Sequence, residues 1–94
     1  MKKSIVEKNP EECYLCGKMG YLEKHHIFHG TANRRIADKY GLTVHLCPEC
    51  HRGKKGVHGE NHEADEKLKQ IGQMYFEERY GHDMFMKLFR KNYL

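Results

Sequence analysis

Two Cys-x-x-Cys pairs constrain this 94-residue chain more than any other feature of its sequence. Two thiols three positions apart can bind one metal ion, and two such pairs supply the four ligands of a tetrahedral zinc site. Residues 17–46 separate the pairs, a segment long enough to hold structure of its own. We therefore expect one structural zinc, bound by Cys13, Cys16, Cys47 and Cys50.

The composition is consistent with a small domain that a metal ion holds together. Hydrophobic residues make up 38% of the chain and charged residues 32%, so the core must be small. The sequence contains no apolar run of transmembrane or signal-peptide length, which predicts a cytoplasmic protein. Disulfides are disfavoured in that reducing compartment, whereas metal binding is not. The alternative, a redox pair of thiols, needs a βαβ context that the pattern does not show.

The hydrophobic pattern of the first half predicts an α+β fold. Residues 1–12 are polar and are expected to form a loose lead-in. Residues 21–28 and 42–46 have the pattern of short strands, and residues 31–40 that of a helix inserted between them. Thr31 or Asn33 is expected to cap the start of this helix, and Gly41 to end it.

The second half is expected to be mainly helical. A short helix should begin near Pro48, and the glycines of residues 53–59 should break it. Apolar residues recur at helical spacing from residue 61 up to Gly81, and a further short helix is expected over about residues 82–91. We expect one domain, residues 1–94, with the lead-in at 1–12, the metal-binding core at 13–59 and a helical extension at 60–94.

Histidines accompany the cysteine pairs. The chain has eight histidines, and neutral imidazole is both a common metal ligand and a common proton acceptor. His25 and His26 follow the first cysteine pair, and His51 directly follows the second. With the two cysteine pairs, this arrangement resembles the HNH endonuclease family, particularly its small phage-type members that carry a four-cysteine zinc site. The resemblance covers roughly residues 13–51.

The resemblance implies a ββα-metal fold, in which a β-hairpin and a following helix surround one divalent metal. It also implies roles for the histidines: His25 and His51 would be metal ligands, and His26 would be the general base that activates water. Adjacent strand residues point to opposite faces, so His25 and His26 can serve different functions. The implied cofactors are the structural zinc and a catalytic divalent metal, magnesium or manganese, with zinc or nickel as alternatives.

The sequence departs from the family pattern on the second strand. Leu42 stands where the family usually has an asparagine, and Asn33 is the nearest substitute as a catalytic residue. His58 is a candidate further metal ligand or phosphate contact. His29 stands where many members have proline.

A net charge of +4 is compatible with a nucleic-acid partner, and the resemblance implies double-stranded DNA in a bacterial or phage-infected cell. RNA remains an alternative substrate. The residues expected to contact phosphates are basic and flank the proposed site: Arg34, Arg35, Arg52, Lys54 and Lys55. His45, His62 and His82 are expected to be ordinary solvated side chains.

The predicted function is therefore a metal-dependent DNA endonuclease. One rival is a zinc-stabilised DNA-binding module that has lost the chemistry, for which the missing asparagine is the main support. The other is a protein-interaction module that uses the helical tail. Sequence specificity, nicking against double-strand cleavage and oligomeric state are not predicted.

Overall fold

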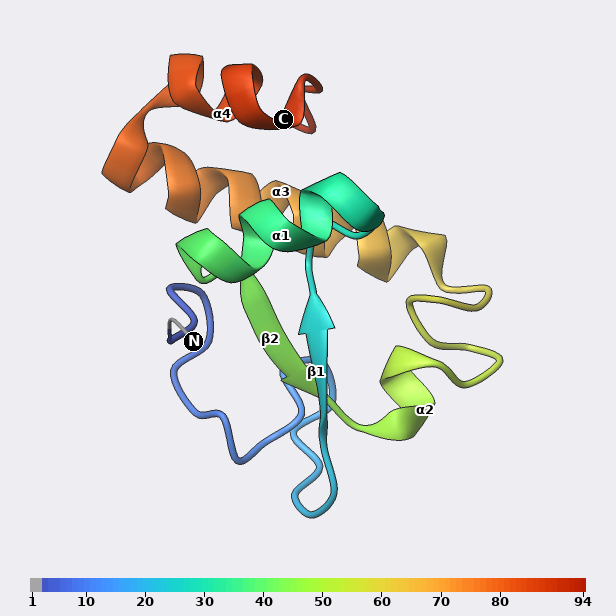
Figure 1. Ribbon diagram of the computed structural model, residues 1–94. Helices are drawn as coiled ribbons and strands as arrows, with labels where there is room; N and C mark the ends of the chain where they lie inside the picture. Colours follow the sequence, from blue (N-terminus) through green and yellow to red (C-terminus); the bar gives the residue numbers. More distant parts are fainter. Residues whose placement is uncertain (1–2) are drawn as a thin grey trace.

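The computed structural model describes residues 3–94 and has the expected α+β class (Figure 1). A two-stranded antiparallel sheet is combined with four helices in this part of the chain. The elements, in chain order, are β1 (Glu23–His26), α1 (Thr31–Tyr40), β2 (Thr43–Leu46), α2 (Pro48–His51), α3 (His62–Tyr80) and α4 (His82–Phe89). The helix inserted between the strands and the helical C-terminal part are confirmed, while both strands are shorter than predicted.

The hairpin has two unlike faces. Lys24 lies opposite His45 and His26 lies opposite Thr43, so these four side chains share one face. His25 belongs to the other face and is only 1% exposed. The divergence expected for the two adjacent histidines is therefore present: one points into the protein and the other toward a polar surface.

Helix α1 begins and ends at glycines. Its N-cap is Gly30, with φ at 97°, and no side-chain hydrogen bond caps the helix within the described residues, so the expected cap at Thr31 or Asn33 is wrong. Gly41 ends the helix in the left-handed conformation, as predicted. The absence of a side chain at Gly41 also allows the lead-in to approach closely, because a Cβ there would collide with the carbonyl oxygen of Lys3.

The lead-in is bound to the second strand and is not loose as predicted. The backbone N–H of Ile5 donates to the Gly41 carbonyl at 2.8 Å. The Glu7 carboxylate accepts from the backbone N–H of His45 at 2.8 Å and from its ring Nδ1 at 2.6 Å. His45 is therefore a partner of the lead-in, which corrects the expectation that it is simply solvated. Val6 enters the core, at 4% exposure.

Helix α3 crosses the hairpin end at which β1 leaves and β2 begins, and α4 packs against α3 (Figure 1). Asn61 caps α3 by accepting from the backbone N–H of Ala64 at 3.1 Å. The buried residues of α3 include Leu68, Gly72 and Phe76. Gly72 is needed because a Cβ there would lie 3.0 Å from the Phe28 ring.

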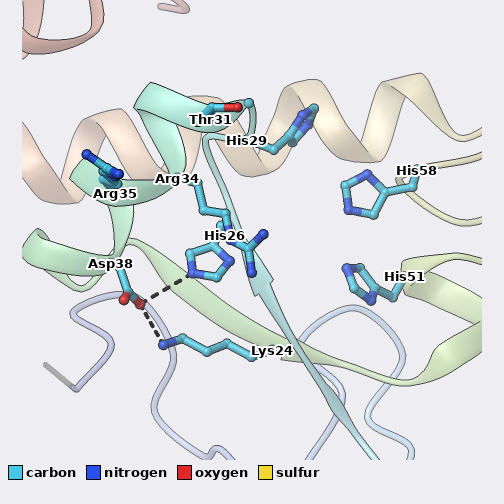
Figure 2. Close-up of a pocket in the computed structure, with 10 residues that line it drawn as sticks. Lys24, His26, His29, Thr31, Arg34, Arg35, Asp38, His51 and His58 are labelled. Atoms are coloured by element: carbon cyan, nitrogen blue, oxygen red, sulfur yellow. Dashed lines mark hydrogen bonds and ion pairs between the residues drawn. The ribbon is translucent and has the colours of Figure 1, made fainter.

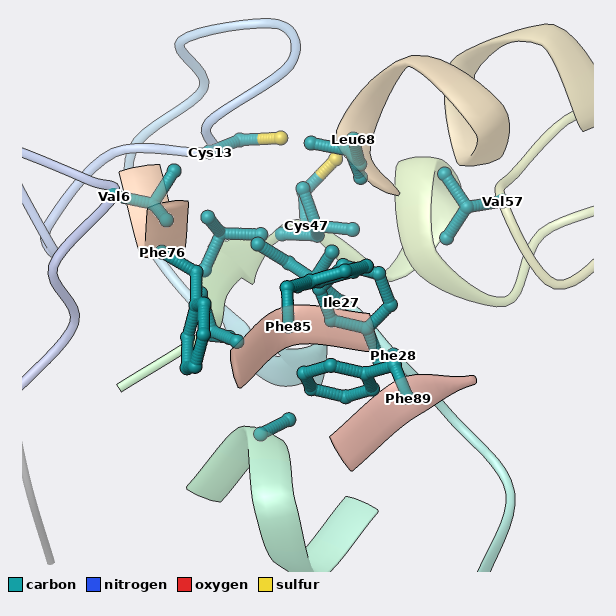
Figure 3. Close-up of a cluster of buried hydrophobic side chains, with 14 residues drawn as sticks. Val6, Cys13, Ile27, Phe28, Cys47, Val57, Leu68, Phe76, Phe85 and Phe89 are labelled. Carbon is teal, nitrogen blue, oxygen red and sulfur yellow. The ribbon is translucent and has the colours of Figure 1, made fainter. Parts of the chain in front are cut away.

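The core forms one cluster that extends from Val6 to the C-terminal helix (Figure 3). Phe28 is its aromatic centre, with ring centroids 5.5 Å from Phe85 and 4.4 Å from Phe89. Helix α4 ends at Phe89, earlier than the predicted residue 91. Among the described helices, none has the length and apolar composition needed to cross a bilayer.

Candidate metal sites and the adjoining pocket

The four cysteines come together, as predicted. The sulfur atoms of Cys13, Cys16, Cys47 and Cys50 all lie within 4.8 Å of one another, and this group could hold a structural metal such as zinc. Cys13 and Cys47 also belong to the buried core, at 2% exposure each (Figure 3). A metal bound here would therefore fasten two distant segments to the same core.

Local backbone geometry presents the two cysteine pairs. Gly17 follows the first pair with φ at 79°, and its N–H donates to the Cys13 carbonyl at 2.8 Å, which closes a tight turn. The second pair straddles the start of α2, where Cys47 is the N-cap and Pro48 occupies the first turn. Tyr14 joins the two regions, because its N–H donates to the His45 carbonyl on β2 at 2.9 Å.

The thiols differ in acidity. Burial raises the pKa of Cys13, but hydrogen bonds from the backbone of Cys47, Cys16 and Leu15 outweigh it and lower the pKa to about 6. Burial, together with the neighbouring thiols, raises the pKa of Cys50 far above its ordinary value. The Cys13 thiol is therefore more acidic than that of Cys50, and a cation bound between them would favour the ionised form of both.

Three histidines form a second group of candidate ligands. One ring nitrogen from each of His25, His51 and His58 lies within 4.8 Å of the others. The ring centroids are 5.1 Å apart for His25 and His51, 5.0 Å for His25 and His58, and 4.8 Å for His51 and His58. The three side chains come from β1, α2 and the loop after α2, so only the folded chain brings them together.

Of the three histidines, His25 has the environment most typical of a metal ligand. It is 1% exposed, and neither ring nitrogen has a hydrogen-bond partner among residues 3–94. Burial and the nearby charges of His51 and His58 lower its pKa to about 3, so the ring is neutral at physiological pH. A buried neutral imidazole without a partner is costly unless a metal uses its lone pair. The residues present therefore fit a cation.

Glycines place His58 beside His51. The loop after α2 folds back on the helix, because the N–H of His58 donates to the His51 carbonyl at 3.0 Å and the N–H of Val57 to the Cys50 carbonyl at 2.8 Å. This approach requires Gly56, since a Cβ there would lie 2.7 Å from the Glu49 carbonyl oxygen. The glycines were predicted to break the helix; they also bring the loop close enough to deliver His58.

Glu23 orients His51 and was missed in the sequence. Its carboxylate accepts from Nδ1 of His51 at 2.9 Å, which leaves Nε2 with its lone pair available to a metal. Arg52 also donates through Nε to Glu23, at 2.8 and 3.0 Å. These bonds lower the pKa of Glu23 and keep it ionised, with the His51 bond the larger cause. The period of the strand places Glu23 on the same face as His25, which is the signal that could have revealed it.

His26 faces a different carboxylate. Its Nε2 lies 3.3 Å from Oδ1 of Asp38 on α1, and Lys24 donates to the same oxygen at 2.6 Å (Figure 2). Because a carboxylate can only accept, this bond holds the proton on Nε2 and leaves Nδ1 as the basic nitrogen. Burial lowers the pKa of His26, although Asp38 opposes that shift, so the ring is neutral at pH 7.

An open pocket of about 920 Å³ joins these groups. Figure 2 shows His51 and His58 on one side and Asp38 on the other, with His26 between them. The rest of the described lining is mostly basic or polar: Lys24, His29, Gly30, Thr31, Arg34 and Arg35. The pocket therefore brings His26, two members of the histidine group and several cationic side chains to one cavity.

The remaining predicted residues lie elsewhere. Asn33, the candidate catalytic residue, is on α1 but is not among the described residues that line the pocket. The residue of α1 that contacts His26 is Asp38. Arg52 is engaged by Glu23. Lys54 and Lys55 are exposed on the loop after α2 and do not line the pocket within the described chain.

His29 is a pocket residue without a predicted role. Its Nε2 lies 3.2 Å from Oδ1 of Asp65, which also pairs with Lys69 at 3.1 Å. Burial raises the pKa of Asp65, but Lys69 and His29 outweigh this and lower it, so the carboxylate is charged. Asp65 thus ties the start of α3 to the rim of the pocket. Its position 36 residues after His29 left no local signal in the sequence.

Comparisons with protein-family models, with curated proteins and with solved structures return no match to this chain.

Proposed function

We propose that the protein is a metal-dependent endonuclease that hydrolyses phosphodiester bonds in DNA, with the ββα-metal arrangement of the HNH family. The observation that carries the proposal is the division of two adjacent histidines. His25 is buried, without hydrogen-bond partners in the described chain, and converges with two further imidazoles, while His26 opens into a basic pocket. The order of β1, β2 and α2 supports the same arrangement.

The donor set indicates which cations to test first. His25, His51 and His58 offer three imidazole nitrogens and no carboxylate. Nitrogen ligands suit zinc, nickel and cobalt, whereas magnesium prefers oxygen. We therefore place zinc and nickel ahead of manganese and magnesium as the activating cation. Such an ion would supply Lewis-acid stabilisation of the charge on the phosphoryl group and the leaving oxygen.

His26 is the proposed general base. Its Nδ1 is free to accept the proton of the attacking water, because Asp38 holds the proton on Nε2. As the ring becomes an imidazolium, the Asp38 carboxylate stabilises the new charge. The family usually has an asparagine on the second strand, where this chain has Leu42, and Asn33 was the nearest substitute. We assign that role to Asp38, which acts through His26 as a positioning residue.

The cationic rim binds the backbone of the substrate. Arg34 and Arg35 line the pocket and are both exposed, so their guanidinium groups are available to phosphate oxygens. Lys24 lines the same pocket while pairing with Asp38. A phosphodiester that enters the pocket therefore meets positive charge on the α1 side and the histidine group on the other.

Nicking of supercoiled plasmid tests the proposal. Protein with its cysteine-bound zinc would be incubated with plasmid and zinc, nickel, manganese or magnesium in turn, beside His26→Ala and His62→Ala. We expect cleavage by the parent protein and by the His62 variant, whose changed side chain is exposed on α3. DNA binding without cleavage under every cation would instead establish the zinc-stabilised binding module.

A further inference from the structure

A second pocket of about 390 Å³ adjoins the first on the same face of the hairpin. The lead-in forms one wall of it, and Lys24, Thr43 and His45 of the hairpin form the other. Lys24 lines both pockets. We call this second cavity the lysine pocket, because Lys3, Lys8 and Lys24 all line it.

The two pockets share one floor. Lys24 and His26 are two positions apart on β1 and project from the same face, a rise of about 6.8 Å along the strand. His45, which is the cross-strand partner of Lys24, continues that face into the lysine pocket. A linear ligand whose reacting group lies at His26 can therefore extend past Lys24 without leaving the surface.

The charge that the lysine pocket offers to solvent is positive. Lys3 and Lys8 are exposed, and the only carboxylate in the described lining is Glu7. The Glu7 side chain is 5% exposed, and both of its oxygens are bound to His45. The Glu7 charge therefore holds the lead-in against β2, and the exposed ammonium groups of Lys3 and Lys8 face solvent, where they can bind an anion.

We propose that the lysine pocket binds a backbone phosphate of the nucleic acid next to the phosphodiester that is cleaved. The inference rests on the proposed function, which supplies the strand whose next phosphate would lie there. Lysine binds phosphate as a compact point charge, and such contacts position a nucleic acid without reading its sequence. The lead-in is thereby a substrate-positioning arm as well as part of the fold.

The test compares two doubly substituted proteins that lose the same charge. Lys3→Gln with Lys8→Gln changes the lysine pocket. Lys67→Gln with Lys87→Gln changes exposed positions on α3 and α4 that line neither pocket in the described chain. Each pair is made in a His26→Ala protein, so that a short DNA duplex is bound but not cut. Binding is measured at several salt concentrations with the cysteine-bound zinc in place.

Loss of one phosphate contact should reduce the slope of log K against log salt by about 0.9. We expect that reduction in the Lys3/Lys8 protein, with weaker binding to every duplex sequence, and an unchanged slope in the Lys67/Lys87 protein. Duplexes with one neutral methylphosphonate linkage give a second readout in proteins that retain His26. Neutralising one linkage beside the cleaved bond should slow the parent protein and have no further effect on the Lys3/Lys8 protein.

Three results would overturn the inference. An equal fall in slope for both double variants would show that only net charge matters. Unchanged DNA binding by the Lys3/Lys8 protein, with loss of its affinity for inorganic phosphate, would identify a free-anion site unconnected with the substrate strand. If no protein binds DNA, the parent included, the proposed function itself is refuted. The proposed phosphate ligand of the lysine pocket is then refuted as well.

Discussion

Replacing His25 by leucine should have opposite effects on stability with and without a metal in the histidine group. His25 is 1% exposed, and its two ring nitrogens have no partner in the described chain. Each buried donor or acceptor left unsatisfied costs about 1–3 kcal/mol. Leucine has a similar size and no polar atom, so His25→Leu should stabilise the protein that holds only its cysteine-bound zinc.

The expected size follows from the two orphaned atoms. Imperfect packing of leucine offsets part of the gain, so we expect a net stabilisation of about 2 kcal/mol. For a domain of this size, 1 kcal/mol corresponds to a shift in Tm of about 4–8 °C. The His25→Leu protein should therefore unfold roughly 8–16 °C above the parent when the histidine group holds no metal.

Added metal should reverse the order. An ion at one hundred times its Kd stabilises the parent by about 2.7 kcal/mol. The variant has lost a ligand and should gain little. The assay is thermal unfolding of both proteins, first with one equivalent of zinc per chain and then with added zinc or nickel. His62→Leu, at an exposed position, is the matched control and should respond to metal as the parent does.

The reasoning fails if His25→Leu unfolds at a lower temperature than the parent in the one-zinc form. That result would mean that the His25 nitrogens have partners in solution, and that the orphaned pair is no sign of a ligand. It also fails if added metal raises the Tm of parent and variant equally.

Four other predictions concern His26, its pH dependence, the structural metal and the loop glycine. His26→Ala should retain DNA binding, measured by gel shift, and lose cleavage by roughly two to four orders of magnitude. Burial holds the pKa of His26 below its usual value, so the cleavage rate should be at its maximum at neutral pH and fall as pH drops through that lowered pKa. The Asp38 carboxylate raises the pKa of His26. Asp38→Asn should therefore move the acid limb of the pH–rate profile to still lower pH. Stripping the cysteine-bound metal with a strong chelator should unfold the protein, seen as loss of its circular dichroism signal, because structural zinc contributes folding free energy directly; an intact fold without metal would count against the site. Gly56→Ala should weaken metal binding by the histidine group, because the added Cβ displaces the loop segment that carries His58. Calorimetry measures this binding, and the structural metal should stay at one equivalent per chain.

Features with a short sequence signature could be predicted. The cysteine spacing was enough to bring four thiols together, and the period of a strand was enough to separate His25 from His26. Glycines marked the ends of α1 and α3, because a helix C-terminus favours a residue that adopts positive φ.

Features that depend on tertiary packing could not be predicted in the same way. The lead-in was expected to be loose because its composition is polar, yet Glu7 binds His45 across 38 positions and Val6 enters the core. Asp65 and His29 are 36 positions apart. The residues next to a carboxylate in the sequence do not show which distant histidine it will contact. These pairs can therefore be identified only from the packed structure.

Helix geometry alone could have ranked Asp38 above Asn33 as the residue of α1 that faces the pocket. At about 100° per residue, positions 33 and 38 differ by about 140° around α1, whereas positions 34 and 38 lie almost on one line. Arg34 was already expected to face phosphate. A helical wheel fixed on Arg34 therefore turns Asp38 toward the site and Asn33 away from it, as the structure has them.

The two groups of candidate ligands are coupled through helix α2. Cys50 belongs to the cysteine group and His51, its neighbour, to the histidine group. The backbone of the same two residues accepts the hydrogen bonds that hold Val57 and His58 in place. A metal in the cysteine group therefore fixes the helix that carries one histidine ligand and the loop that carries another. His25 lies on β1, outside this helix and loop, so the four residues of α2 contribute to both groups of candidate ligands.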